Sequence, residues 1–420
     1  MKKRVLDKVL SLEMPSTSFN QISQCNRCGS CLAVCPVYGV ELKEINSPRG
    51  KMALARHLTN NEIAFSPRLS NIISQCLLCG SCLDVCPSGV QGSHIFSELR
   101  REAVRRLGQD WRKLLMSKLL NSANGLEEGV RFARLARSIM DTLAPKGITL
   151  DRFDISFLPD FNTPFFRYRM PKVIHPAGKP LGKAAYFYGC ATDFLFAEVG
   201  EATVKALSRA GYEVYIPPGQ MCCSIPVFMS GNYEMALPNI LHNIDLLSSG
   251  PWDIVVVDCA TCGLAFKHEY PRVLEALGED PKQARTLSTH VFDVTQLLCD
   301  MPAKKGVETR EDKKPILVTY HDPCHLAKGQ KITEEPRRVL KNSPHLEYVE
   351  MAQADSCCGG GGAFQFDHPE IASQITGRKI NNIVQTGAQV VATGCPSCRI
   401  TLRKSLKSRA VRVCHPVELL

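Results

Sequence analysis

The sequence predicts an α+β protein of several domains, in which a helical amino-terminal domain precedes two α/β domains of one design. Three observations support this fold class. Two short cysteine motifs of identical spacing lie within the first hundred residues. Strand-like and helix-like runs alternate from residue 183 onwards. Within that alternation, a second pattern of cysteines repeats the first pattern almost residue for residue.

The chain has 420 residues, enough for two or three domains with cores of their own. Its composition, 44% hydrophobic and 22% charged, is ordinary for a soluble globular protein. No run of 18 apolar residues is present, and no apolar signal core follows the basic start Met1-Lys2-Lys3-Arg4. We therefore expect a cytoplasmic protein that meets the inner face of a membrane only through partners.

Eighteen of the twenty cysteines fall into four sets. A chain without a secretion signal uses cysteines as metal ligands or catalytic thiols more often than in disulfides. The first two sets have the spacing Cys-x2-Cys-x2-Cys-x3-Cys-Pro of bacterial ferredoxins. They comprise Cys25, Cys28, Cys31 and Cys35, then Cys76, Cys79, Cys82 and Cys86. Zinc is the alternative, but no histidine lies at a zinc-finger interval, so the spacing favours two [4Fe–4S] cubane clusters.

In two-cluster ferredoxins the fourth cysteine of each motif binds the other cluster. The predicted ligands of the first cluster are therefore Cys25, Cys28, Cys31 and Cys86. The predicted ligands of the second cluster are Cys76, Cys79, Cys82 and Cys35. Crossed ligation of this kind also holds two clusters close enough for fast electron transfer.

Residues 1–100 are expected to form a helical ferredoxin domain, because the two motifs start 51 residues apart and residues 49–58 between them read as a helix. Residues 101–182 are expected to form a helical segment and a proline-rich linker. Apolar residues at helical spacing predict one helix over residues 93–120, with Trp111 in the core, and a second helix over residues 130–143. Five prolines in residues 151–181 predict the linker.

The two α/β domains are expected over residues 183–300 and 301–420, related by a pseudo-twofold. In the first, strands are predicted at 184–189, 213–216 and 253–258, with helices at 198–210 and 233–247. In the second, strands are predicted at 316–320, 347–350 and 389–393, with a helix at 369–386. Such alternation implies a parallel sheet in each domain. The cysteines follow the carboxyl ends of the strands, where α/β sheets bind their ligands.

Each α/β domain carries five cysteines. The first set comprises Cys190, Cys222, Cys223, Cys259 and Cys262, and the second comprises Cys324, Cys357, Cys358, Cys395 and Cys398. The intervals agree to one residue: Cys190 to Cys222 is 32 and Cys324 to Cys357 is 33. A cubane takes four thiolates, so five indicate either an unusual cluster or a spare ligand.

The pattern Cys…Cys-Cys-Gly…Cys-x-x-Cys resembles the cysteine-rich CCG domains of heterodisulfide reductases and of 2-hydroxyacid and glycerol-3-phosphate dehydrogenases. The whole chain, including Ser47-Pro48-Arg49-Gly50-Lys51, is similar to iron–sulfur subunits of the glycolate oxidase type. This resemblance implies one or two further [4Fe–4S] clusters, of the noncubane type found in heterodisulfide reductases. The first set departs from the pattern, because Ser224 stands where the second set has Gly359. We therefore expect a cluster at the second set first, and at the first set only if serine can replace this glycine.

Several smaller features have competing interpretations. The run Gly359–Gly362 lacks the lysine of a phosphate-binding loop, so we expect it to approach cluster sulfur. His321 and His325 flank Cys324; a structural role is the default, and a proton donor for chemistry at the adjacent cluster is the alternative. Both histidines are weak catalytic candidates on that ground. Cys299 and Cys414 fit no set and are expected to be buried apolar thiols.

The sequence has no Gly-x-Gly-x-x-Gly dinucleotide motif and no flavin motif, so no NAD or flavin is expected on this chain. The resemblance implies an FAD-containing dehydrogenase subunit as electron donor, and a quinone or a further electron-transfer or membrane subunit as acceptor. The net charge is +10, but the basic residues do not alternate with aromatic residues, so no nucleic acid is expected as a partner.

The leading hypothesis is thus an electron-transfer subunit of a glycolate or lactate dehydrogenase complex, without substrate oxidation of its own. The alternatives are a reductase that cleaves a disulfide at a CCG cluster, an anaerobic glycerol-3-phosphate dehydrogenase subunit, and a scaffold without redox activity.

Overall fold

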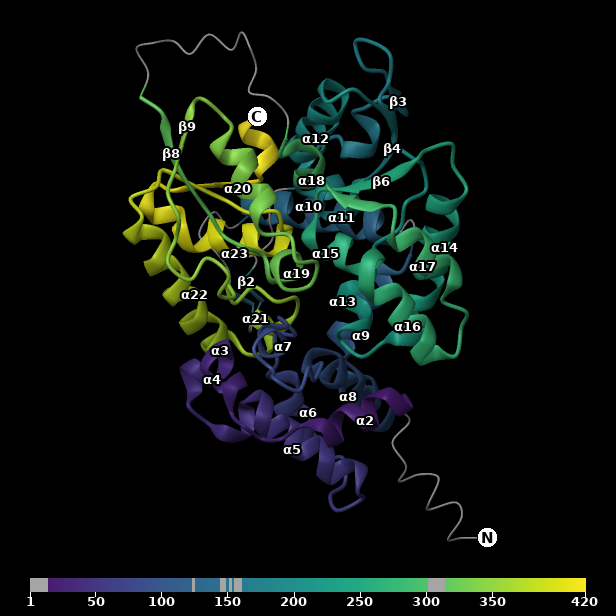
Figure 1. The fold of residues 1–420 in the computed structure, drawn as a ribbon, viewed down its shortest axis with the longest axis vertical. Helices are drawn as coiled ribbons and strands as arrows, with labels where there is room; N and C mark the ends of the chain where they lie inside the picture. Colours follow the sequence, from purple (N-terminus) through teal and green to yellow (C-terminus); the bar gives the residue numbers. More distant parts are fainter. Residues whose placement is uncertain (1–13, 123–124, 144–148, 151–152, 155–160, 301–313) are drawn as a thin grey trace.

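The computed structural model describes residues 14–122, 125–143, 149–150, 153–154, 161–300 and 314–420. Figure 1 shows the helical amino-terminal part, in purple and blue, beneath two α/β parts, in teal to green and in yellow-green. The architecture is α+β with several domains, as the sequence predicts. None of the described helices has both the length and the apolar character needed to cross a bilayer.

The amino-terminal part consists of short helices around one apolar core, which includes Ile22, Met52, Ile73 and Phe96. Pro48 occupies the first turn of α5, and the Ser47 hydroxyl accepts a hydrogen bond from Gly50 N at 2.9 Å, which confirms the helix predicted there. The helices are α2 Ser16–Gln24, α3 Ser30–Val34, α4 Pro36–Glu41, η1 Glu44–Asn46, α5 Pro48–Thr59, α6 Pro67–Ser74, α7 Ser81–Asp84 and α8 Gly92–Leu107.

The single helix predicted over residues 93–120 is wrong, because the chain breaks after α8 at Gly108, which has a φ of +77°. Helix α9, Trp111–Leu120, then starts afresh with Asp110 as its cap. The break ends the apolar stripe of α8, so Trp111 is 64% exposed instead of buried. Helix α10, Gly125–Leu143, begins five residues before the helix predicted there.

The proline-rich segment packs against the first α/β part where the structure describes it, from residue 161. Phe165 and Phe166 are buried, and the 3-10 turn η3 Phe166–Tyr168 starts at the second of them. Strand β3, Val173–Ile174, pairs antiparallel with the edge of the first sheet. This antiparallel edge departs from the purely parallel sheet that the sequence predicts. Within the predicted linker residues 151–160 the structure describes two positions only, which form the short strand β2 Phe153–Asp154 and pair with β1 Thr149–Leu150.

The two α/β parts share one strand order. The first sheet runs β3-β5-β4-β6-β7, with β5 Tyr212–Tyr215, β4 Gly182–Phe187, β6 Ile254–Val257 and β7 Val291–Asp293. The second runs β9-β8-β10-β11, with β9 Leu346–Tyr348, β8 Ile316–Tyr320, β10 Val390–Ala392 and β11 Arg412–Cys414. Apart from β3, neighbouring strands are parallel. The predicted strands are present, and β7 and β11 are additional.

Helices cover both faces of each sheet. Alternate residues of β4 enter different cores: Ala185 and Phe187 join one, and Ala184 and Tyr186 the other. The predicted long helices are α12 Ala197–Arg209, α14 Tyr233–Ser248 and α22 Pro369–Gln385. The remaining ones are α11 Gly189–Phe194, α13 Ile225–Phe228, α15 Ala260–Leu264, η4 Ala265–Glu269, α16 Tyr270–Leu277, α17 Lys282–Ser288, α18 Val294–Leu298, α19 Cys324–Ala327, α20 Glu334–Lys341, α21 Phe364–Asp367, α23 Pro396–Leu406, η5 Lys407–Arg409 and η6 Pro416–Leu419.

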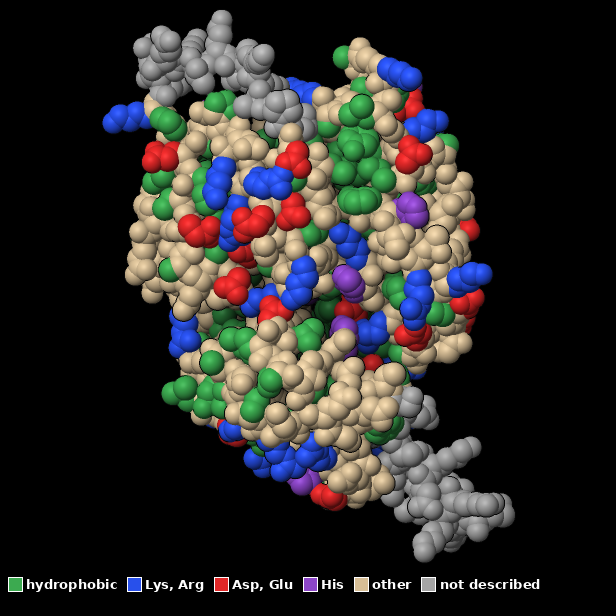
Figure 2. All heavy atoms as spheres, in the orientation of Figure 1, with side chains coloured by type: hydrophobic (Ala, Val, Ile, Leu, Met, Phe, Trp, Pro, Cys, Tyr) green, Lys and Arg blue, Asp and Glu red, His purple; other side chains and the backbone are tan. Residues whose placement is uncertain are grey.

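The two α/β parts also share a core. Val339 and Val417 of the second part belong to the cluster beneath the first sheet. Cys299 and Cys414 are 3% and 2% exposed, which confirms that they are buried thiols. On the face in Figure 2, Lys and Arg side chains are mixed with Asp and Glu over the α/β parts, and a group of basic side chains lies at the lower end of the molecule.

Candidate iron–sulfur centres

The first ferredoxin motif wraps around the start of α3. Gly29, with a φ of +88°, turns the chain into this helix, which carries Cys31. Burial raises the pKa of the Cys31 thiol, and the neighbouring Cys25 and Cys28 add to the shift. Cys86, the predicted fourth ligand, packs with Cys25 against the same apolar core, and its sulfur accepts a hydrogen bond from Val90 N at 3.4 Å.

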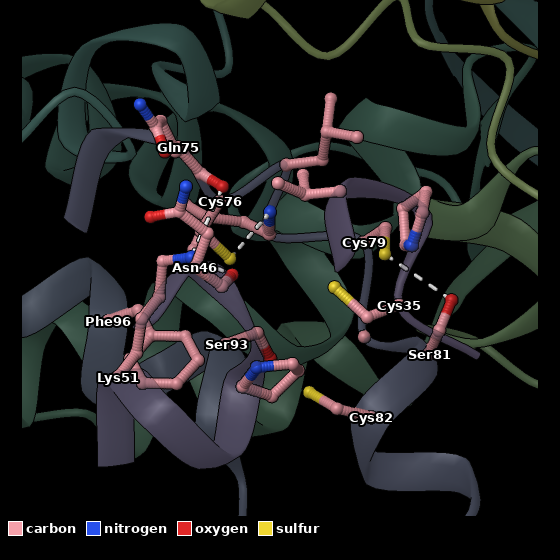
Figure 3. Close-up of a pocket in the computed structure, with 16 residues that line it drawn as sticks. Cys35, Asn46, Lys51, Gln75, Cys76, Cys79, Ser81, Cys82, Ser93 and Phe96 are labelled. Atoms are coloured by element: carbon pink, nitrogen blue, oxygen red, sulfur yellow. Dashed lines mark hydrogen bonds between the residues drawn. The ribbon is translucent and has the colours of Figure 1, made fainter. Parts of the chain in front are cut away.

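The second ferredoxin set lines one cavity. Figure 3 shows the sulfur atoms of Cys35, Cys76, Cys79 and Cys82 facing a common space. Cys35 comes from the first motif, so the structure brings together the crossed set that the spacing predicts. Burial raises the pKa of Cys35 to about 12, with contributions from Cys76 and Cys79. Four thiols around one cavity fit a cluster bound by thiolates.

Lys51 is a site residue that the cysteine spacing does not predict. Its side chain is 2% exposed and lines the same cavity. The ammonium donates hydrogen bonds to the backbone oxygens of Asn46 and Gln75. Burial lowers its pKa, while Cys76 and Cys35 act in the opposite direction. A buried cation beside thiolates offsets their negative charge. In the sequence, only the position of Lys51 in the Ser47–Lys51 segment could have indicated this role.

The first five-cysteine set gathers at the carboxyl ends of β4, β5 and β6. Cys190 and Cys222 place their sulfurs 4.0 Å apart. Hydrogen bonds from Cys222 and Cys262 lower the pKa of Cys223 to about 6. Cys259 lies between β6 and α15, as the cap of that helix, and is close to Cys262 and Cys223. The structure therefore brings all five predicted thiols into one group.

The second five-cysteine set repeats this arrangement at the ends of β8, β9 and β10. Hydrogen bonds from Cys357 and Cys398 lower the pKa of Cys358, the counterpart of Cys223. Cys324 interacts with Cys357 and Cys395. In both sets the second cysteine of the adjacent pair is thus the central acceptor. The donor sets fit thiolate-bound clusters, and these ten cysteines would hold them.

Ser224 and Gly359 each follow a pair of adjacent cysteines, and both have a left-handed backbone conformation. Their φ angles are +59° and +82°, both in the left-handed region. At Gly359 a Cβ would lie 2.6 Å from Thr376 Oγ1 and 2.8 Å from Ala372 O, so glycine is required there. Ser224 adopts this backbone with a side chain, and its hydroxyl donates to Cys222 O at 3.3 Å. The first set therefore keeps its geometry without the glycine.

The two histidines beside Cys324 occupy different surroundings. His321 is 1% exposed, and neither ring nitrogen has a hydrogen-bond partner among the described residues. Burial lowers its pKa to about 3. His325 lies within 3.0 Å of Thr261 Oγ1, and burial lowers its pKa to about 4. Burial thus favours the neutral form of both rings, and a role as proton donor stays a prediction.

The second ferredoxin set adjoins the second five-cysteine set. Burial raises the pKa of Cys79, and the neighbouring Cys324 adds to this shift. Cys79 and Cys35 pack against the apolar cluster that contains Cys357. Across the same boundary, Lys328 Nζ donates to Ser81 Oγ at 2.7 Å. The two thiol groups thus meet at the interface between the ferredoxin and second α/β parts.

The two five-cysteine sets meet through the loop between Cys259 and Cys262. Thr261 Oγ1 lies 3.6 Å from Cys395 Sγ as well as 3.0 Å from the His325 ring. Ala260 N donates to Gly394 O at 2.9 Å. Thr261, which lies between two cysteines of the first set, therefore touches a sulfur of the second set.

A further cavity opens beside the first five-cysteine set. Cys190 and Cys222 lie in its wall. Arg167 and Gln220 supply polar groups, and Asp193 Oδ1 accepts a hydrogen bond from the Arg167 backbone N–H at 3.0 Å. Tyr188 and Phe194 provide the apolar part of the wall.

Comparison with known proteins matches residues 21–90 to a 4Fe-4S dicluster domain and residues 184–267 and 318–403 to a cysteine-rich domain, CCG. A probable glycolate oxidase iron–sulfur subunit of Bacillus subtilis is 30% identical over 95% of this chain and 93% of its own length. One of the subunits of the fumarate reductase (CoM/CoB) of Methanothermobacter marburgensis is 28% identical over 94% of this chain and 71% of its own.

A third relative belongs to the dihydromethanophenazine:CoB–CoM heterodisulfide reductase of Methanosarcina acetivorans, and this subunit is 25% identical over 92% of this chain and 90% of its own. These relatives are named as subunits of oxidoreductases, and the first reaches 30% identity across nearly its whole length. The chain therefore belongs to the family of iron–sulfur oxidoreductase subunits in which a 4Fe-4S dicluster domain precedes two cysteine-rich CCG domains.

Proposed function

We propose that this chain relays electrons from an FAD-containing subunit, which oxidises a 2-hydroxy acid such as glycolate or lactate, to a quinone or another acceptor. The proposal divides the chain into a ferredoxin domain (1–100), a connecting segment (101–182) and two CCG domains (183–300 and 301–420). The relay works in the cytoplasm and reaches a membrane through partner subunits. Iron–sulfur clusters bound at the four cysteine sets would supply one-electron transfer.

The observation that carries the proposal is the contact between successive thiol groups. Cys35 links the two ferredoxin motifs, Cys79 adjoins Cys324, and Thr261 adjoins Cys395. This order supports a path from the ferredoxin sets to the second CCG set and then to the first. A relative named as a glycolate oxidase iron–sulfur subunit, matched over nearly its full length, supports the donor class.

The test uses the full chain purified anaerobically, alone and with its FAD-containing partner. Four [4Fe–4S] clusters predict about 16 irons per chain, and about 8 would leave the CCG sets empty. Glycolate- or lactate-dependent dye reduction is expected from the complex and not from the chain alone. Activity of the chain alone, or a complex that reduces dye with neither acid, would contradict the proposal.

A second candidate function is reduction of a disulfide at the first CCG set. The cavity beside Cys190 and Cys222 supports it, because it would let a small substrate reach these two thiols. The Arg167 and Gln220 side chains in its wall are already bonded to Asp193 and to the Tyr186 backbone. The relative named as a heterodisulfide reductase subunit supports the same chemistry. Under this proposal a disulfide changes the electron paramagnetic resonance (EPR) signal of the first CCG set, and Cys190→Ala removes that response. A signal unchanged by a series of disulfides rejects this candidate.

A further inference from the structure

The imidazole of His321 is a buried polar group that has no well-formed hydrogen bond with the described residues, although the backbone of Ala354 is close enough to raise its pKa. It follows β8, where its backbone N–H donates to Ala392 O at 2.9 Å and fixes its position. Its side chain is 1% exposed, and both ring nitrogens lack hydrogen bonds within the described ranges. Buried polar atoms nearly always have a partner, so this ring points to a group that it contacts in the working protein.

The ring faces the second five-cysteine set. One ring nitrogen, Cys358 Sγ and Cys398 Sγ all lie within 4.8 Å of one another, and all three residues are buried. A neutral imidazole has one N–H donor, and thiolate or sulfide sulfur accepts hydrogen bonds from such donors. A group held by Cys358 and Cys398 would therefore lie within reach of the ring.

The first five-cysteine set has an apolar residue at the matching position. His321 lies three residues before Cys324, and Phe187 lies three residues before Cys190. Phe187 is fully buried in the cluster that contains Cys223 and Cys262. A Cβ on Gly189 would lie 3.0 Å from Cys262 Sγ and 3.6 Å from the Phe187 ring, so this ring borders the thiols. An apolar ring thus occupies the place of the imidazole.

We propose that His321 donates its ring N–H to a sulfur of the cluster bound by the second CCG set, and that this bond raises the reduction potential of that cluster above that of the first. Reduction adds negative charge, which a hydrogen-bond donor stabilises, and hydrogen bonds to cluster sulfurs are a recognised determinant of potential. His321 is therefore a positioning and tuning residue. The proposal rests on the proposed function only in requiring a cluster at the second set.

The first experiment uses the wild-type holoprotein labelled with 15N-histidine. Pulsed EPR on the second-set signal, assigned by its loss in Cys358→Ser, is expected to show a weak 15N coupling. The coupling should disappear in His321→Gln and persist in His325→Gln, the matched control on the other side of Cys324. A second-set signal without histidine coupling, or a coupling that follows His325, would overturn the proposal.

The second experiment compares the midpoint potentials of both CCG sets in a reciprocal exchange. His321→Phe is expected to lower the second-set potential by an amount equal to a tenfold change in the reduction equilibrium, about 59 mV for one electron. Phe187→His is expected to raise the first-set potential, and His321→Gln, which keeps an amide donor, should have the smaller effect. Unchanged potentials in folded, fully iron-loaded His321→Phe would overturn the proposal. A second set without iron in the wild type would overturn it together with the proposed function, and the iron content distinguishes the two failures.

Discussion

The two CCG sites have the same five-thiol layout in different surroundings. In both, hydrogen bonds converge on the second cysteine of the adjacent pair, Cys223 or Cys358. Around the second site the chain places His321 and the buried Lys379, whose Nζ donates to Gln353 O at 2.6 Å. The first site is bordered by the apolar Phe187 instead. The repeat has thus kept its ligand positions while the polarity around them has diverged.

The sites also differ in their neighbours. The second site adjoins Cys79 of the ferredoxin domain, whereas the first site borders the cavity that contains Arg167. The difference suggests that one site receives electrons from the ferredoxin domain and the other delivers them or reacts. Four changes would break or sharpen this comparison.

The largest effect is expected from removing one thiol of either site. Cys324→Ala should cost about four irons per chain and should stop reduction of the first CCG site by a reduced ferredoxin domain. Cys190→Ala should cost the same iron and leave reduction of the second site intact. Freeze-quench EPR after mixing with a fast reductant measures both steps. Equal first-site reduction in Cys324→Ala and the wild type would contradict the series order.

A smaller effect is expected from exchanging the residues after the cysteine pairs. Gly359→Ser should destabilise the second domain by about 1–3 kcal/mol, because its Cβ meets Thr376 and the Ala372 carbonyl. Ser224→Gly should change the stability of the first domain by less than about 1 kcal/mol, because relief of the positive φ is offset by loss of the buried hydrogen bond to Cys222 O. Chemical unfolding followed by cluster absorbance measures both. A Gly359→Ser variant as stable as the wild type would contradict this prediction.

Acid should weaken the second domain through His415. Its ring nitrogen accepts a hydrogen bond from Val417 N at 3.2 Å, and burial lowers its pKa to about 3. The unfolded chain takes up this proton near pH 6.5, so the contribution to stability is complete above that pH. It is lost as the pH falls toward 3, by up to about 1.4 kcal/mol per pH unit.

The matched variant is His415→Asn, whose side-chain oxygen can accept the same hydrogen bond and does not titrate in this range. Hydrogen exchange of the second sheet, measured from pH 7 to 5, should show a shallower loss of protection in the variant. The first domain has Val294 at the corresponding place after β7 and serves as the internal reference. Identical pH profiles in variant and wild type would contradict this prediction.

The smallest effect is expected from the surface contact between α7 and the second CCG domain. Lys331 is 67% exposed and pairs with Asp84 at 2.5 Å. Exposed ion pairs contribute about 0–1 kcal/mol, so Lys331→Ala should leave stability and electron transfer nearly unchanged. Lys328→Ala should have the larger effect, because this side chain is 9% exposed and bonded to Ser81. Thermal unfolding of both variants measures the difference.

The sequence predicted the features that depend on short-range pattern. Strands β4, β6, β8 and β10 are strongly apolar runs, and their places were predicted within two residues. Strands β7 and β11 have three residues each, too few for a periodic signal. Trp111 was wrongly predicted to lie in the core, because the helical spacing of apolar residues continues in the sequence past Gly108, although the backbone turns at that residue.

The ligand roles of the cysteines remain predictions, but their grouping could be read from spacing because each motif is local or repeats. The residues around the thiols could not. Thr261, Lys328 and Lys379 reach the second site only through the packing of separate elements. Spacing identifies candidate ligands, whereas tertiary contacts determine what surrounds them.

Ala260 and Thr261 lie between Cys259 and Cys262 of the first CCG site, and they also form part of the wall of the second CCG site. Their hydrogen bond to Gly394 and their contact with Cys395 tie the two sites into a single unit of assembly. The second CCG repeat cut from this chain would therefore lack Thr261, which forms part of the wall of its site.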